Sequence, residues 1–116
     1  MIVNSQTRIY GVNGLTQEDL SNVKTFLQGA VYTWVKNRRG EWFSIRDLMG
    51  GTNFSWKDTP LQSLYDKHIA WGKDHESAIK SAGKDAGKLL KRVLQDDNRQ
   101  FETRKAFFTT EYKWIE

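Results

Sequence analysis

The chain has 116 residues, a formal net charge of +4 and no cysteine. This length supports one hydrophobic core, and the 6 Phe, 5 Trp and 4 Tyr residues are too many for a disordered chain. A chain without cysteine forms no disulfide, and no apolar run has the length of a membrane helix or the form of a signal peptide. We therefore expect a single folded domain in the cytoplasm.

Residues 1–15 precede the first strong pattern. Residues 7–12 have the composition of a short strand, and Asn13-Gly14 is a common turn sequence. The same segment would equally suit an arm without regular structure. We expect an N-terminal strand or arm over residues 1–15, followed by one domain over residues 16–116.

The first helix is predicted to begin after Thr16, which is a good N-cap, with Asp19 at the capping-box position. It is expected to end near Asn37. Its apolar residues recur at helical spacing and predict one buried stripe: Leu20, Val23, Leu27, Ala30, Val31 and Trp34.

Three shorter elements are expected next. Residues 41–45 have the pattern of a short extended segment. Ser44 and Asp47 form a capping pair for a brief helix that Gly50-Gly51 would end. Thr59-Pro60, an N-cap residue followed by proline at the first helical position, predicts a helix over residues 60–70.

Residues 74–97 are helical in pattern but contain Gly83 and Gly87. A glycine inside a helix costs about 1 kcal/mol relative to alanine. This cost favours a short helix, a turn near Gly83-Lys84 and a second helix over residues 85–95. A continuous helix packed closely through both glycines is the alternative.

The C-terminal residues change to a strand pattern. Residues 100–104 and 109–115 are rich in threonine and aromatic residues, and polar and apolar side chains alternate in both. This alternation predicts a β-hairpin, with its turn near Lys105-Ala106.

This order of elements resembles a winged helix-turn-helix domain. The residues that carry the resemblance are the run 77–83, the helical pattern 85–94 and the hairpin 99–115, with Gly83 or Gly87 as the turn glycine. The expected fold is therefore α+β and winged-helix-like, with helices packed with a short strand and a C-terminal hairpin.

The resemblance implies a nucleic-acid-binding module, with duplex DNA as partner and a role as a transcriptional or other DNA-associated regulator. In that family a recognition helix, here residues 85–95, enters the major groove, and the hairpin wing contacts the backbone or minor groove. Positive charge gathers in residues 31–57 and 73–105. The candidate contact residues are Lys80, Lys84, Lys88, Lys91, Arg92, Arg99, Arg104, Lys105, Arg38 and Arg39.

The alternative is a protein-interaction or structural module that does not bind nucleic acid. A lysine stripe on an amphipathic helix is often only a solvated face. Four further tryptophans would be difficult to bury together in so small a domain, and exposed ones would favour a homodimer or another protein partner: Trp42, Trp56, Trp71 and Trp114.

Enzymatic signatures are sparse, and we expect no catalytic residues, metal or cofactor. His68, on the apolar face of its helix, and the exposed His75 are too few for a zinc site. No nucleophile elbow or glycine-rich phosphate loop is present. One weak pattern, Asp97 followed by Glu111-Tyr112-Lys113, is similar to the metal-binding and E-x-K spacing of restriction-type nucleases.

Overall fold

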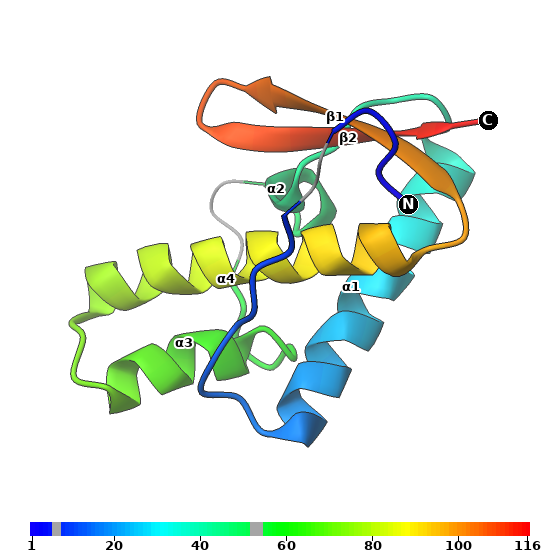
Figure 1. Ribbon diagram of the computed structural model, residues 1–116. Coiled ribbons are helices and arrows are strands. Elements are labelled where there is room, and N and C mark those ends of the chain that lie inside the picture. The colour runs from blue at the N-terminus through cyan, green and yellow to red at the C-terminus, as the bar shows by residue number, and fades with distance from the viewer. Residues whose placement is uncertain (6–7, 52–54) are drawn as a thin grey trace.

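The computed structural model describes residues 1–5, 8–51 and 55–116. Within these residues the protein is an α+β domain, as predicted, with helices below and a two-stranded antiparallel hairpin above them (Figure 1). The elements in chain order are α1 (Gln17–Asn37), α2 (Ile45–Leu48), α3 (Gln62–Ala70), α4 (His75–Asp96), β1 (Gln100–Ala106) and β2 (Thr109–Ile115).

Helix α1 begins and ends where the sequence predicts. The Thr16 hydroxyl accepts a hydrogen bond from the Asp19 backbone N–H at 3.0 Å and caps the first turn. The helix ends at Asn37, and the Arg38 N–H bonds back to the Trp34 carbonyl. Its buried residues are spaced four apart, so they form one face: Val23, Leu27, Val31 and Val35.

Helix α2 is a single turn fixed by its cap. The Ser44 hydroxyl accepts from the Asp47 backbone N–H, and the Asp47 carboxylate accepts from the Ser44 N–H, so the predicted capping box is confirmed. Gly50 and Gly51 follow with φ of 92° and 109°, which is backbone that L-residues rarely adopt. Helix α3 starts at Gln62, because Thr59 and Pro60 form the turn that leads into it.

Helix α4 is continuous over 22 residues, so the predicted turn near Gly83-Lys84 and the separate helix over residues 85–95 are wrong. The alternative of a continuous helix is confirmed, but its close packing at the glycines is wrong, because a Cβ built on Gly83 or Gly87 would meet no atom within 4 Å. Tertiary packing outweighs the two glycine costs, because α4 buries an uninterrupted apolar face against α1 and α3. The apolar residues of that face are Ala78, Ala82, Ala86, Leu89, Leu90, Val93 and Leu94.

The hairpin is confirmed, but its turn lies two residues later than predicted. Lys105 and Ala106 still pair with Thr110 and Thr109, so Phe107 and Phe108 form the loop. Neither phenylalanine belongs to the usual turn residues, which explains why the sequence pattern placed the turn too early.

Both outer edges of the hairpin gain a short extra partner. Phe43 forms an antiparallel bridge with Tyr112 of β2, through two backbone hydrogen bonds of 2.8 Å, within the extended segment predicted at residues 41–45. Ile2 forms a parallel bridge with Phe101 of β1. Residues 8–12 form no strand, so the strand alternative is wrong over these residues and the arm without regular structure is the alternative that fits; residue 7 lies outside the described residues.

The core lies between α1, α4 and the inner face of the hairpin. Phe43 packs at its centre, with ring centroids 6.3 Å from Phe101 and 6.1 Å from Tyr112. Leu27 of α1 and Leu90 of α4 are fully buried against this aromatic cluster. The hairpin therefore packs on the helices through aromatic residues, and it does so from the side opposite α3 (Figure 1).

A buried polar cluster joins α3 to α4. Asp85 of α4 lies 2.8 Å from the Lys67 Nζ and 2.7 Å from the His68 Nε2, both on α3. The Lys67 ammonium also donates to the Asn13 carbonyl, which ties the N-terminal arm to the helix pair. His68, which the sequence places on the apolar face of its helix, is 5% exposed. These contacts fix α3 and α4 as neighbours.

Candidate functional site

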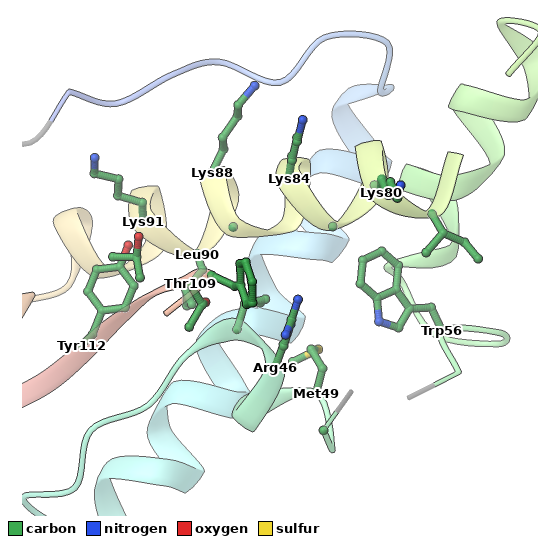
Figure 2. A pocket seen from close by; sticks show the side chains of 18 of the residues that line it. Arg46, Met49, Trp56, Lys80, Lys84, Lys88, Leu90, Lys91, Thr109 and Tyr112 are labelled. Atoms are coloured by element: carbon green, nitrogen blue, oxygen red, sulfur yellow. The ribbon is translucent and has the colours of Figure 1, made fainter. Parts of the chain in front are cut away.

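A groove of about 1360 Å³ opens between α4, α2, the segment around Trp56 and the tip half of the hairpin. Figure 2 shows Lys84 and Lys88 extending from α4 toward the N-terminal segment, with Arg46 and Met49 on the other side of the helix. In this view Trp56 lies at the right-hand end of the groove. The groove therefore collects residues from six separate parts of the chain, because residues of the N-terminal segment and of α3 line it as well.

The charge of this groove is one-sided. Its lining includes eight lysine and arginine residues and no aspartate or glutamate, among the residues that the structure describes. Of these eight cations, only Arg104 has a carboxylate of the described residues within ion-pair distance, that of Glu111 at 2.8 Å. We call this feature the cationic groove, and its cations are Arg46, Lys57, Lys80, Lys84, Lys88, Lys91, Arg104 and Lys105.

Helix geometry explains the lysines of α4. Lys80, Lys84 and Lys88 are spaced four apart, so they share one face, and Lys91 lies on it one turn further along. The face opposite is the buried one. Acidic residues of α4 leave the middle of the lysine face clear, because Asp85 points inward to α3 while Glu76 and Asp96 stand at the helix ends.

Two glycines give the helix side of the groove its shape. Gly83 and Gly87 line the groove one turn apart, between the lysines. A Cβ built on either would meet no atom within 4 Å. No packing contact therefore requires glycine at these positions. The missing side chains leave the helix backbone open to a ligand, and each glycine costs about 1 kcal/mol of helix stability relative to alanine.

The groove brings together six of the ten candidate contact residues: Lys80, Lys84, Lys88, Lys91, Arg104 and Lys105. The structure places the other four elsewhere, each beside a carboxylate. Arg92 lies 4.0 Å from Asp96, and Arg99 lies 2.8 Å from Asp97. Arg38 and Arg39 at the end of α1 pair with Glu41 and Glu116 respectively.

Sequence reasoning missed Arg46 and Lys57 as site residues, and it considered Trp56 only as a contact for a protein partner. The two cations belong to the basic stretch 31–57, which is the signal that was available. Nothing in their spacing relates them to the lysines of α4. The packing of α2 against α4 brings Arg46 to the same groove, and Lys57 lines it from the segment around Trp56.

The five tryptophans do not form a single exposed cluster. Trp34, Trp42, Trp56 and Trp114 are half-buried, and Trp71 is 57% exposed. Cations lie over four of these five rings, those of Trp34, Trp42, Trp71 and Trp114. The Arg104 guanidinium lies 4.0 Å from the Trp42 ring centroid, and that of Arg39 lies 5.0 Å from the Trp114 centroid.

The three residues of the nuclease-like pattern are not assembled into a site. Asp97 lies just before the open end of the hairpin, where Gln100 pairs with Ile115. Glu111 pairs with Arg104, four residue pairs further toward the turn. The third member, Lys113, is bound to Glu102 at 3.0 Å. Across residues 1–5, 8–51 and 55–116 no cluster of three His, Asp or Glu residues has the geometry to hold a metal ion.

Asp97 instead has a structural role. Burial alone would raise the pKa of its carboxyl group, but hydrogen bonds from the Arg99 side chain and backbone and from Gln28 outweigh burial and lower the pKa to about 2. The carboxylate thereby joins the end of α4 to α1. On the groove wall, burial raises the pKa of Tyr112 to about 12, so this phenol stays protonated at neutral pH.

Comparison with protein-family models, curated proteins and solved structures finds no match to this chain. None of the helices that the structure describes has the length and apolar character needed to cross a membrane.

Proposed function

We propose that the protein binds nucleic acid, with duplex DNA as the partner, through the cationic groove and the adjoining lysine face of α4. The observation that carries this proposal is the lining of eight cations without an acidic residue among those described. A polyanion that fills such a surface releases counterions, and that release favours binding. A role as a transcriptional or other DNA-associated regulator would follow.

The arrangement of elements supports a winged-helix-like mode of binding. Helix α3, the short connection over residues 71–74 and helix α4 form a helix–turn–helix, and the hairpin follows α4 directly. The isolated bridge between Phe43 and Tyr112 places an extended residue beside β2 of the two-stranded hairpin. We propose α4 as the recognition helix and the β1–β2 hairpin as the wing. The turn of the helix-turn-helix is then the connection between α3 and α4, and not the turn that the sequence predicted near Gly83.

The chemistry of the groove favours backbone contacts over base recognition. Lysine ammonium groups bind phosphates as point charges and carry little sequence information. Arg46 is the groove cation best suited to a bidentate contact with a base edge, because Arg104 is already paired with Glu111. We therefore propose mainly sequence-independent affinity.

The experiment that tests this proposal is a titration of a labelled duplex, two helical turns long, followed by fluorescence anisotropy. With four to six phosphates contacted, affinity is expected to fall roughly 10²- to 10³-fold between about 50 and 200 mM salt. Absence of salt-dependent binding would exclude the proposal.

A matched pair of charge reversals locates the surface. Lys84→Glu, in the groove, is expected to weaken binding about tenfold and to lower the salt slope, because a phosphate contact becomes a repulsion. Lys36→Glu changes the net charge equally on exposed α1 surface outside the groove lining. Equal losses from the two variants would show that only overall charge matters.

A protein-interaction or structural module remains the alternative, and the exposed Trp71 is the residue to test for it. Sedimentation of the wild type and of Trp71→Ala would detect a dimer or partner complex that depends on this side chain. Such a complex, together with no affinity for duplex DNA, would favour the alternative.

A further inference from the structure

The tip of the hairpin exposes two adjacent aromatic rings. Phe107 is 87% exposed and Phe108 is 81% exposed, and their ring centroids lie 4.1 Å apart. No other large hydrophobic side chain in the described part of the chain is as exposed. The tip lies at the outer edge of the molecule, at the opposite end of the hairpin from both chain termini (Figure 1).

The backbone of this turn is also unusual. Phe108 has φ of 69°, in the left-handed region that favours glycine or asparagine and is unfavourable for a bulky residue. A two-residue hairpin loop closes well with Asn-Gly or Asp-Gly. Closing the hairpin therefore requires neither the two rings nor a bulky residue at positive φ, so the tip carries a feature that its fold does not need.

The position of the two rings relates them to the cationic groove. Phe108 lines the groove itself, and Lys105, just before the turn, lines it as well. An apolar tip beside a cation-lined surface matches a ligand in which flat apolar groups lie next to anionic groups. Stacked base pairs between two phosphate backbones have this combination.

We propose that Phe107 and Phe108 form a wedge that inserts between adjacent base pairs of duplex DNA held in the cationic groove, and that the wedge kinks the duplex there. This inference rests on the proposed function. Apolar side chains that enter a base step unstack it partly and bend the helix. Flexible pyrimidine–purine steps are the easiest to open, so they are the expected site of insertion.

A second copy of this chain suits the tip less well than DNA. The chain is basic, with a net charge of +4, and the cationic groove next to the tip would face like charge if another copy approached with its own groove. Repulsion between like charges opposes this contact, whereas a duplex supplies both phosphates and stacked bases.

The test uses a duplex with 2-aminopurine at a central TA step and a fluorescence resonance energy transfer pair on its ends. Binding of the full chain is expected to raise 2-aminopurine fluorescence and to shorten the distance between the ends. The double variant Phe107→Ala, Phe108→Ala is expected to lose both signals and to bind about tenfold more weakly.

Two further variants separate the wedge from folding and from general hydrophobicity. Phe108→Gly removes one ring but suits the left-handed backbone, so the fold is retained while the signals fall. Ile69→Ala removes an apolar side chain that is 40% exposed on α3, away from the groove lining, and is expected to keep both signals.

The outcomes distinguish the wedge from the function on which it rests. If the wild type shows no salt-dependent binding, the proposed function fails. If it binds but the double alanine variant gives the same bending and 2-aminopurine signals, the wedge is overturned and the function stands. Cosedimentation with anionic phosphatidylserine vesicles, or a dimer, would point to another partner if either is lost in the double alanine variant. Such a result would also overturn the wedge if the DNA signals of that variant equal those of the wild type.

Discussion

Asp85 on α4 and Lys67 on α3 form an ion pair of 2.8 Å, and both side chains are about nine-tenths buried. This pair removes from the solvent-exposed surface of α4 the one acidic residue in the middle of that helix. His68 shares the same carboxylate oxygen at 2.7 Å. The contact that joins α3 to α4 therefore also keeps the lysine face free of negative charge.

We predict that Asp85→Asn strongly destabilises the fold. The substitution leaves the buried Lys67 ammonium without its countercharge, and breaking one side of a buried pair typically costs about 3–5 kcal/mol. The free energy of unfolding from urea titration measures the loss. Glu76→Gln, an exposed acid in the first turn of the same helix, is the control and should change stability little.

A double substitution checks the physical reason. Lys67→Met together with Asp85→Leu removes both charges and keeps apolar volume, so it is expected to cost less than Asp85→Asn alone. A double variant as unstable as the single one would show that packing or His68, rather than the unpaired ammonium, dominates.

Gly83→Ala and Gly87→Ala are predicted to stabilise the protein and weaken its binding to DNA. Each replaces a helical glycine where a Cβ meets no atom within 4 Å, so a gain of about 1 kcal/mol is expected from each. The added methyl groups project into the groove, so affinity for duplex DNA should fall. Thermal unfolding and anisotropy titration measure the two effects.

Gly29 supplies a matched control for the two groove glycines. It lies within α1, outside the groove lining, and its Cβ would also meet no atom within 4 Å. Gly29→Ala should therefore stabilise the protein by a similar amount and leave DNA affinity unchanged. A loss of affinity in this variant would attribute the effect to helix stiffening instead of groove shape.

Local signals in the sequence predicted the parts of the fold that depend on near neighbours. Thr16 with Asp19, and Ser44 with Asp47, form the expected caps because each pair interacts across one turn. The turn predicted at Gly83 is absent because burial of surfaces distant in the sequence outweighs the local cost of the glycine, and a short sequence window does not contain those surfaces.

In the candidate site, too, the sequence predicted what depends on near neighbours and missed what depends on tertiary packing. The lysines of α4 share a face by periodicity alone, so the sequence was enough to group them. Arg46 joins them only because α2 packs beside α4, and Arg99 is taken up by Asp97. The turn at Phe107-Phe108 has no turn signal, since its residue types are those of a strand.

Asp97 is predicted to contribute to stability in a pH-dependent way. Its pKa of about 2 in the folded chain lies below the ordinary 3.8, so the ionised form is favoured by folding. The resulting stabilisation, about 2 kcal/mol, is complete above about pH 5 and is lost as the pH falls through 3.8 toward 2. Asp97→Asn should therefore be less stable at pH 7 and show a flatter decline between pH 5 and pH 2. Parallel curves for the two proteins over this range would contradict the assignment.

The last prediction concerns the stability of the hairpin tip, independently of any ligand. Phe108→Gly places the residue best suited to positive φ at a position with φ of 69°, so unfolding free energy should rise by up to about 1 kcal/mol. Phe107→Gly, at the neighbouring position without positive φ, should give no such gain. Urea titration of both variants measures the difference. If Phe108→Gly destabilises the protein instead, the contact between the two rings at 4.1 Å supports the turn, and the tip is not a strained feature kept for binding.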